Sequence, residues 1–263
     1  MIAELQGILR DAGKIARRHF GNLSEGQVEF KSEADLVTVA DREVEAYLRQ
    51  RLAQLCPDAG FVGEEGTAAN RTGDGRWFLV DPIDGTTSFV HGIPYYSISL
   101  ALKEKGRTVL GMVYLPEFDE LYHAEPGRGA WKNGTKRLSV SRTDRLIHAL
   151  GATGFACVRA RIKPDNLPIF NRAIYRIRGI RRLGSAAIDL CLVAEGKFDL
   201  YWEIHIQPWD IAAAALIVQE AGGRVTDLDG GPEFELRREI LATNGLVHDA
   251  FLELVREAHA EAR

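Results

Sequence analysis

Apolar positions recur at helical spacing in several parts of the chain. They predict one helix over residues 3–20 and a second over residues 40–55. Gly21 and Pro57 end these helices, because glycine and proline do not continue them. The same spacing predicts later helices over residues 165–175, 185–195, 208–221 and 246–260.

Shorter apolar or alternating segments predict strands. Residues 77–80 form a continuous apolar run typical of a buried strand, and residues 61–63 form a shorter one. Further strands are expected at residues 97–102, 108–115, 120–124, 149–155, 177–183, 198–202 and 224–227. The strands expected between residues 97 and 124 are joined by short connections, which favour antiparallel pairing. Mixed helices and strands with an antiparallel part predict an α+β protein built in layers.

Length and composition indicate an ordinary globular chain. At 263 residues it can bury roughly three quarters of its unfolded surface. We expect a single domain over residues 1–263, whose two halves, 1–145 and 146–263, meet without a sharp boundary. The net charge of −4 gives no support for nucleic-acid binding. Basic residues cluster over 172–182, which we interpret as a solvated face or a rim near an anionic substrate.

The cysteines and the N-terminus indicate the compartment. Cys56, Cys157 and Cys191 are odd in number and lack a CxxC spacing, so a disulfide framework or a zinc site is not expected. The N-terminus has acids and bases within an amphipathic pattern, which is not typical of a signal peptide, and the apolar run 211–218 is too short to cross a bilayer. A cytoplasmic protein without a membrane partner is expected.

Candidate chemistry concentrates in the segment Asp81–Thr87, of sequence DPIDGTT, which follows the predicted strand 77–80. Two acids at a strand end attract divalent cations, and free N–H groups at a helix start bind phosphate. Asp81 and Asp84 cannot share one face of a regular strand at this spacing. A kink at Pro82 could bring them together and expose the Ile83 carbonyl as a third ligand.

Two more acids stand out by context. Glu64 follows the strand at 61–63, and Asp210 begins an almost wholly apolar helix. Taken alone, Glu64 reads as a surface acid and Asp210 as either a helix cap or a metal ligand. Together with Asp81 and Asp84 they would bring a site of two divalent cations to formal neutrality. Oxygen ligands suit Mg²⁺ or Mn²⁺, and without metal such acids should titrate as a coupled set above their ordinary pKa values.

The absence of several known motifs reduces the number of candidate nucleophiles. It has no G-x-S-x-G elbow, no Cys-x5-Arg loop and no Walker A sequence, and the acid pair does not have D-x-D spacing. A metal-activated water remains as the candidate. Thr86 and Glu64 could orient it and accept its proton. Asp41 either polarises Thr86 or caps the helix that it begins.

Several segments closely resemble the signatures of inositol monophosphatases. They are Gly63–Glu65, Trp77–Phe89 and Pro208–Gly223, with Lys31-Ser32, Asp35–Asp41 and Gly184–Ala187 also fitting. The resemblance extends over residues 5–250. It implies a layered αβαβα sandwich like that of inositol monophosphatase and fructose-1,6-bisphosphatase. It also implies a homodimer and a phosphomonoesterase that uses two or three Mg²⁺ ions and is often lithium-sensitive.

The resemblance also assigns roles residue by residue. Metal ligands would be Glu64, Asp81 as the bridging ligand, the Ile83 carbonyl, Asp84 and Asp210. Gly85 and Thr86 would offer N–H groups to phosphate, while Thr86, paired with Asp41, and Glu64 would activate water. Lys31 would be a nearby basic residue, Ser185 and Ala186 part of the substrate wall, and Glu203 a contact to a substrate hydroxyl.

These observations lead to one expected function and three alternatives. We expect hydrolysis of a small phosphorylated substrate, inositol monophosphate, to inositol and phosphate. The segment 204–208 differs from that of animal inositol phosphatases, so histidinol phosphate and fructose 1,6-bisphosphate stay open as substrates. An alternative of another class is a regulatory or binding protein that retains the phosphatase fold.

Overall fold

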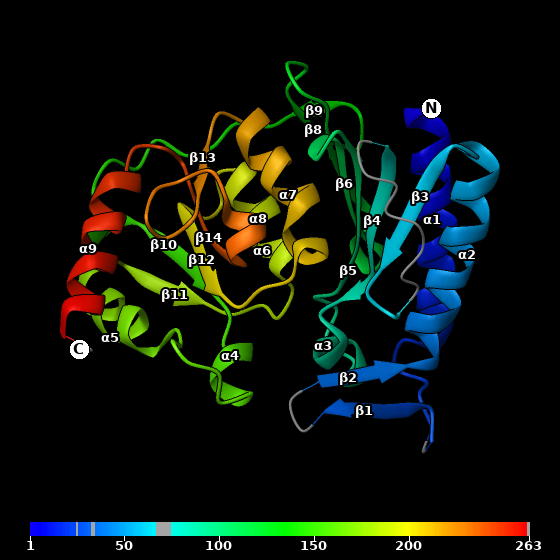
Figure 1. Cartoon of the computed structure of the whole chain (residues 1–263), viewed down its shortest axis with the longest axis horizontal. Coiled ribbons are helices and arrows are strands. Elements are labelled where there is room, and N and C mark those ends of the chain that lie inside the picture. Colours follow the sequence, from blue (N-terminus) through cyan, green and yellow to red (C-terminus); the bar gives the residue numbers. More distant parts are fainter. Residues whose placement is uncertain (25, 33–34, 67–74, 262–263) are drawn as a thin grey trace.

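Two β-sheets with helices between and outside them form the molecule (Figure 1). The computed structural model describes residues 1–24, 26–32, 35–66 and 75–261. In these ranges the seven-stranded sheet has the order β3-β4-β5-β6-β7-β8-β9 and the five-stranded sheet the order β11-β10-β12-β14-β13. The hairpin β1–β2 stands apart from both. The layered α+β architecture expected from the sequence is confirmed.

The helices in the described ranges are α1 (Ile2–His19), α2 (Val39–Leu55), α3 (Thr86–Val90), α4 (Ala156–Arg159), α5 (Leu167–Arg176), α6 (Ala186–Ala194), α7 (Pro208–Glu220), α8 (Phe234–Arg237) and α9 (His248–Glu261). The strands are β1 (Val28–Ser32), β2 (Asp35–Thr38), β3 (Ala59–Gly63), β4 (Arg76–Asp84), β5 (Ser97–Glu104), β6 (Arg107–Leu115), β7 (Glu120–Ala124), β8 (Ala130–Lys132), β9 (Lys136–Arg137), β10 (Leu150–Thr153), β11 (Gly179–Arg181), β12 (Leu200–Ile204), β13 (Arg224–Thr226) and β14 (Glu239–Thr243).

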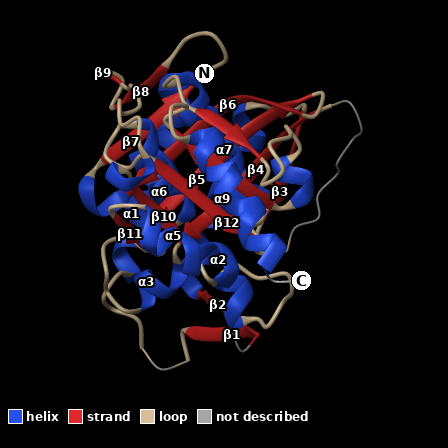
Figure 2. Cartoon of the chain, turned by 90° about the vertical axis from the view of Figure 1, so that its left-hand side faces the viewer, coloured by secondary structure: helices blue, strands red, loops and turns tan. Residues whose placement is uncertain are grey.

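Five layers follow from which face each element buries. Helices α1 and α2 cover the outer face of the seven-stranded sheet, and α6 and α7 lie between the two sheets. Helices α5 and α9 cover the outer face of the five-stranded sheet, as Figure 2 also shows. None of the described helices combines the length and apolar character that a bilayer crossing requires.

Strand periodicity divides the seven-stranded sheet between two cores. Phe78 and Val80 of β4 face the α1–α2 layer, whereas Leu79 between them faces α7. Their partners on β5 follow the same alternation, since Leu79 pairs with Ala101 and Phe78 with Leu102. Both faces of this sheet are therefore buried, which explains why β4 reads as a continuous apolar run.

Helix α7 packs closely on the sheet because β6 carries a glycine there. A Cβ on Gly111 would lie 2.3 Å from the carbonyl oxygen of Ala213 in α7. The start of α7, which carries Asp210, lies against β5, where Ser99 donates its hydroxyl to the Trp209 carbonyl oxygen at 3.0 Å.

Every helix and strand predicted from the sequence is present, with ends shifted by a few residues. Strands β5, β6 and β7 pair antiparallel as expected. Pattern reasoning missed β14, which pairs with both β12 and β13 inside the five-stranded sheet. It also missed the short elements β1, β2, β8, β9, α4 and α8. The charged residues just before β14 obscured its short apolar segment. Cys56, Cys157 and Cys191 are free thiols, in agreement with the prediction.

Candidate active site

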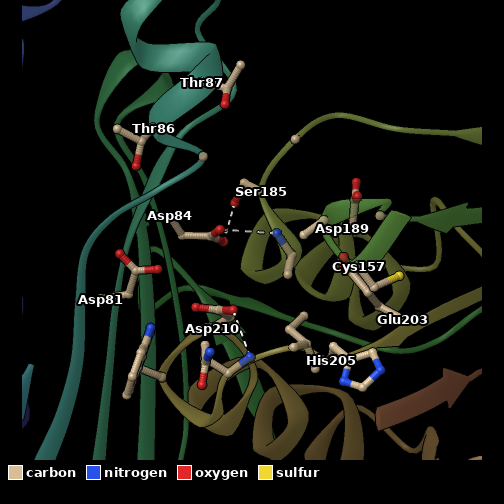
Figure 3. Close-up of a pocket in the computed structure, with 18 of the residues that line it drawn as sticks. Asp81, Asp84, Thr86, Thr87, Cys157, Ser185, Asp189, Glu203, His205 and Asp210 are labelled. Carbon is tan, nitrogen blue, oxygen red and sulfur yellow. Dashed lines mark hydrogen bonds between the residues drawn. The ribbon is translucent and has the colours of Figure 1, made fainter. Parts of the chain in front are cut away.

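A cavity of about 340 Å³ opens between the two sheets, beyond the end of β4 (Figure 3). Segments from distant parts of the sequence line it, including β4, the start of α3, α4, the start of α6, β12 and the start of α7. Its acidic lining residues are Glu64, Asp81, Asp84, Asp189, Glu203 and Asp210.

A β-bulge brings Asp81 and Asp84 to the same cavity. Asp81 pairs with Ser99 of β5 and Asp84 with Ser97, so β4 carries one extra residue between the two pairs. On a regular strand, residues three apart point to opposite faces of the sheet. The one inserted residue turns the side chains of Asp81 and Asp84 to the same face. The kink expected at Pro82 thus takes the form of a bulge. Within it the Ile83 N–H donates to Asp81 Oδ1 at 3.0 Å.

Gly85 turns the chain from β4 into α3. Its φ is +98°, and a Cβ there would lie 3.0 Å from the Tyr95 carbonyl oxygen and 3.2 Å from that of Gly184. Glycine adopts this conformation readily and also fits the space. The first N–H groups of α3 have no partners within the helix, and Gly85, Thr86 and Thr87 line the acidic cavity.

Thr86 connects this turn to Asp41. The Thr86 hydroxyl lies 3.1 Å from the Ile83 carbonyl oxygen and 3.4 Å from Asp41 Oδ1. The other carboxylate oxygen of Asp41 accepts from the backbone N–H of Thr38 at 2.8 Å and closes a capping box at the start of α2. Asp41 therefore contacts Thr86 and caps a helix at once. Burial raises its pKa to about 6, against the opposing effect of the Thr38 hydrogen bonds.

The start of α6 holds the side chain of Asp84. Ser185 donates its hydroxyl to Asp84 Oδ2 at 2.6 Å, and the Ala187 N–H donates to the same oxygen at 2.7 Å. The Ala186 N–H lies 3.4 Å from Oδ1. Burial raises the pKa of Asp84 to about 6, while these donors and the Arg182 charge lower it. An acid from one sheet thus satisfies N–H groups of a helix that packs on the other sheet.

Asp210, at the start of α7, likewise both caps a helix and lies at the site. One oxygen accepts from the Gln207 N–H at 3.1 Å and caps the helix, and the residue also lines the cavity. Burial raises its pKa well above the usual range, and the charges of Asp84 and Glu64 raise it further.

Asp81 lies among the other acids of the cavity. It is 2% exposed. Burial, followed by the charges of Glu64, Asp84 and Asp210, raises its pKa well above the usual range. The upward direction expected from the sequence therefore holds for the pKa of Asp81, Asp84 and Asp210, with burial as the main cause and the neighbouring acids adding to it at Asp81 and Asp210.

The wall opposite β4 carries a second acidic group, at Glu203 on β12. Its side chain accepts a hydrogen bond from the Tyr201 hydroxyl. Burial raises its pKa to about 7, while Tyr201 and the Arg182 charge lower it. Gly154 makes room beside it, since a Cβ there would lie 2.1 Å from Glu203 Oε1.

The donor set fits divalent cations, although in these ranges no three Asp, Glu, His or Cys side chains converge on one metal position. Four carboxylates and the Ile83 carbonyl line one cavity, and oxygen donors of this kind are preferred by Mg²⁺ and Mn²⁺. Buried acids that raise one another's pKa cost free energy, which bound cations would offset.

Most site residues predicted from the sequence meet in this cavity. It is lined by Glu64, Asp81, Ile83, Asp84, Gly85, Thr86, Ser185, Ala186, Glu203 and Asp210. Asp41 lies behind Thr86, at hydrogen-bond distance from it. The side chain of Lys31 lies outside the described residues. The individual roles of these residues stay predictions.

Sequence reasoning missed Asp189, Cys157 and Arg182, which also line the cavity. A signal existed for Asp189, because it is an isolated acid within the apolar helix AAIDLCLVA. Arg182 was seen only as part of a basic cluster. Its position at the cavity supports the interpretation of that cluster as a rim near an anionic substrate.

Comparison with known proteins agrees with the fold and identifies the family. The model of the inositol monophosphatase family matches residues 1–260, so the chain belongs to this family. It is a phosphatase, of a family that acts on small phosphorylated substrates and is generally metal-dependent.

Individual relatives cover almost the whole chain. Inositol monophosphatase 2 of Solanum lycopersicum is 42% identical over 257 residues, 95% of each chain. A Pseudomonas aeruginosa protein named Nus factor SuhB is 39% identical over 253 residues, which are 94% of this chain and 92% of that protein. The solved structure of a Thermotoga maritima IMPase superposes with a TM-score of 0.88 at 37% identity, covering 99% of this chain and 98% of that one.

Proposed function

We propose that this phosphatase is Mg²⁺-dependent and hydrolyses inositol monophosphate to inositol and phosphate. One observation carries the proposal: four carboxylates and the start of α3 face one cavity, whose opposite wall presents Glu203. The acids suit cations, the helix start suits a phosphate, and Glu203 suits a hydroxyl group.

Glu64, Asp81, the Ile83 carbonyl, Asp84 and Asp210 would hold the cations, two or three in number, with Mn²⁺ as an alternative to Mg²⁺. When bound, these cations would neutralise the phosphoryl group and lower the pKa of a coordinated water. Asp84 and Asp210 are already held by N–H groups of α6 and α7. Those contacts restrict the two side chains and reduce the ordering needed when a cation binds.

The remaining roles belong to the turn after β4. N–H groups of Gly85 and Thr86 would bind the phosphate oxygens. The Thr86 hydroxyl has one proton, and if it is donated to Asp41 its oxygen is left free to accept a hydrogen bond from the attacking water. Glu64 would orient the same water and accept its proton. Ser185 and Ala186, with the nearby Lys31, would border the substrate.

The direct test is phosphate release with Mg²⁺ and with a chelator, using inositol 1-phosphate, histidinol phosphate and fructose 1,6-bisphosphate. We expect turnover of inositol 1-phosphate that the chelator abolishes. Asp81→Asn should lower kcat/KM by roughly three orders of magnitude, because it removes a charge from the centre of the donor set. Asp199→Asn is the matched control, since Asp199 is a buried acid that does not line the cavity.

Two results would contradict the proposal at different levels. Turnover unaffected by chelator and by Asp81→Asn would exclude the metal-dependent mechanism. Turnover of histidinol phosphate or fructose 1,6-bisphosphate orders of magnitude faster than that of inositol 1-phosphate would change the substrate and leave the mechanism in place.

A second function is supported by the relative named Nus factor SuhB. A chain of this family could also act through a protein partner while retaining the phosphatase fold. A pull-down with wild type and the low-activity Asp81→Asn variant tests this. Equal capture of one specific partner by both proteins would support the second function, whereas no specific capture would exclude it.

The assembly is expected to be a homodimer. Size-exclusion chromatography with light scattering should give twice the 29.2 kDa mass of the chain. A mass of one chain at micromolar concentration would contradict this.

A further inference from the structure

Glu45 is a buried acid of α2 that does not line the cavity and is 3% exposed. Its Oε2 atom accepts a hydrogen bond from the backbone N–H of Glu65 at 2.8 Å. Its Oε1 atom accepts one from Arg49 Nη2 at 3.1 Å, one turn further along the helix. Helix α2 packs against β3 and β4 (Figure 1). The Glu45 carboxylate therefore joins this helix to the residue that directly follows Glu64.

Hydrogen bonds of the backbone fix the chain on both sides of the Glu64 side chain. The Glu64 N–H donates to the Val80 carbonyl oxygen of β4 at 3.2 Å. The pairing of β3 with β4 ends at Gly63, so the sheet does not extend to the next N–H group, that of Glu65. The Glu45 carboxylate accepts from that group in the place of a strand partner.

The glycine before Glu64 makes room for the Glu45 carboxylate. A Cβ on Gly63 would lie 2.2 Å from Glu45 Oε2 and 2.5 Å from the carboxylate carbon. A buried carboxylate costs free energy, and an apolar side chain at this position of α2 would avoid that cost. An acid and a glycine that fit each other in this way favour a role in placing residues 64 and 65 over a role in stability alone.

Helix α2 presents two acids toward the residues of the site. Asp41 and Glu45 are four residues apart and therefore lie on one face of the helix. Asp41 Oδ1 lies 3.4 Å from the Thr86 hydroxyl, and Glu45 holds the residue after Glu64. Thr86 and Glu64 are the two residues to which the proposed function assigns the activation of water. One face of α2 thus contacts the chain at or next to both of them.

We propose that Glu45 is a positioning residue for Glu64, because it fixes the backbone at residue 65 and so holds the Glu64 side chain in the cavity beside Asp81. This rests on the proposed function and adds a residue to the same site. Glu64 lines the cavity, whereas Glu45 touches neither the substrate nor a cation. A group that activates water works over a narrow range of positions, and a shift of about 1 Å can cost up to about 100-fold in rate.

The test is a double-mutant cycle of Glu45→Ala and Glu64→Gln, assayed with inositol 1-phosphate and saturating Mg²⁺. Glu45→Ala should lower kcat about 10-fold or more and change KM less than about 3-fold, because Glu45 acts on the activation of water and not on contacts to the substrate. Glu64→Gln should lower kcat further than this. In its background Glu45→Ala should change kcat less than about 2-fold, since the effect passes through a group that is already altered.

Two conservative variants separate the reach of the Glu45 side chain from its charge. Glu45→Gln keeps an acceptor oxygen at the same distance from the backbone and should retain kcat within about 3-fold of wild type. Glu45→Asp keeps the charge but is one methylene shorter, so its kcat should fall nearly as far as that of Glu45→Ala.

Leu52→Ala is the matched control for a loss of stability in the same helix. Leu52 is 1% exposed and does not line the cavity. Its truncation leaves a space in the core and should lower Tm by about 5–10 °C. At 25 °C, where the variant is folded, kcat should stay within about 2-fold of wild type. A purely structural role of Glu45 would give the same pattern as Leu52→Ala.

Binding of Mn²⁺ to the protein, measured by calorimetry, tests the position of Glu64 apart from turnover. Glu45→Ala should weaken it about 3-fold or more, and Leu52→Ala should leave it unchanged. The inference is overturned if Glu45→Ala lowers kcat by the same factor with and without Glu64→Gln, or if it leaves both kcat and Mn²⁺ affinity unchanged. A loss of kcat in Glu45→Gln as large as that in Glu45→Ala would also overturn it. A wild type that releases no phosphate would count against the proposed function only, and the Mn²⁺ titration would then decide the inference.

Discussion

At the scale of single residues, Gly85 combines backbone strain with lack of space. Gly85→Ala should lower the free energy of unfolding by about 1–3 kcal/mol, because alanine at positive φ is strained and its Cβ would crowd the Tyr95 and Gly184 carbonyl oxygens. Since Asp84 and Thr86 flank this residue, kcat/KM should fall as well. Urea unfolding and phosphate release measure the two effects.

Gly245→Ala separates strain from crowding. Gly245 has a φ of +85°, with nothing within 4 Å of the position that a Cβ would take. We expect a loss of about 1 kcal/mol with activity unchanged. If both variants lost the same stability and kept full activity, the close packing around Gly85 would have no functional effect.

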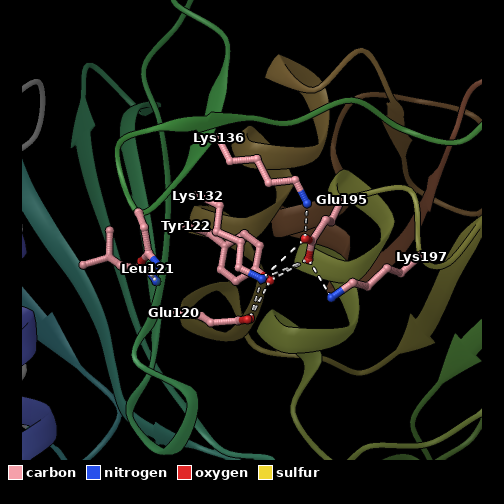
Figure 4. A network of polar contacts seen from close by, with 8 residues as sticks. Glu120, Leu121, Tyr122, Lys132, Lys136, Glu195 and Lys197 are labelled. Carbon is pink, nitrogen blue, oxygen red and sulfur yellow. Dashed lines mark hydrogen bonds and ion pairs between the residues drawn. The ribbon is translucent and has the colours of Figure 1, made fainter.

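At the scale of elements, Glu195 joins α6 to the far end of the seven-stranded sheet (Figure 4). Its side chain lies 2.7 Å from Lys136 Nζ, 3.0 Å from Lys197 Nζ and 2.8 Å from the Tyr122 hydroxyl. Burial alone would raise the pKa of Glu195, but hydrogen bonds from Lys136, Lys197 and Tyr122 and the Lys132 charge outweigh it and lower the pKa to about 2.

Glu195→Gln should therefore destabilise the protein by about 2 kcal/mol at pH 7, because it removes the charge of a buried carboxylate that pairs with Lys132, Lys136 and Lys197. The pKa in the folded state lies below the usual 4.5. The advantage of wild type is then fully present above pH 4.5 and declines as the pH falls toward about 2. Urea unfolding of both proteins between pH 7 and pH 3 measures it.

The matched control is Asp249→Asn, which breaks the exposed ion pair with Arg224. Exposed pairs contribute little, so a loss below about 0.5 kcal/mol is expected. A stability difference between Glu195→Gln and wild type that stayed constant with pH would show that the charge of Glu195 is not what stabilises this corner.

At the scale of the whole molecule, α7 contributes to the core between the two sheets and makes them depend on one another. Its buried residues pack against both the seven-stranded and the five-stranded sheet. We therefore expect the halves 1–145 and 146–263 to unfold as one domain. Urea transitions followed by far-UV circular dichroism and by tryptophan fluorescence should coincide, with Trp77 and Trp131 reporting one sheet and Trp202 the other. Two separated transitions would contradict this.

The local sequence pattern was sufficient to predict the longer elements and the main acids of the site. Helix periodicity identified α1, α2 and α7 because each buries one stripe or its whole surface, and that burial fixes which residues are apolar. Asp81 and Asp84 were informative because carboxylates that continue a buried apolar run cost free energy unless they are hydrogen-bonded, paired or bound to a metal.

Where the sequence was ambiguous, the structure shows why. Asp41 and Asp210 each read as a cap or a site residue, and each uses one oxygen to cap a helix while lying at the site. Both interpretations draw on the same property, a carboxylate at a helix start. One sequence pattern could not separate them.

The sequence by itself determined the longer helices, most strands, most acids of the site and the layered α+β class, because short-range periodicity and burial govern these. The tertiary structure decided three features that involve contacts between elements. They are the bulge that turns Asp81 and Asp84 to one cavity, the hydrogen bonds from the start of α6 to Asp84, and the unsatisfied oxygen of Asp189. The hydrogen bond from Ser185 to Asp84 joins residues about a hundred positions apart, and only the packing of two sheets around α6 and α7 brings them together.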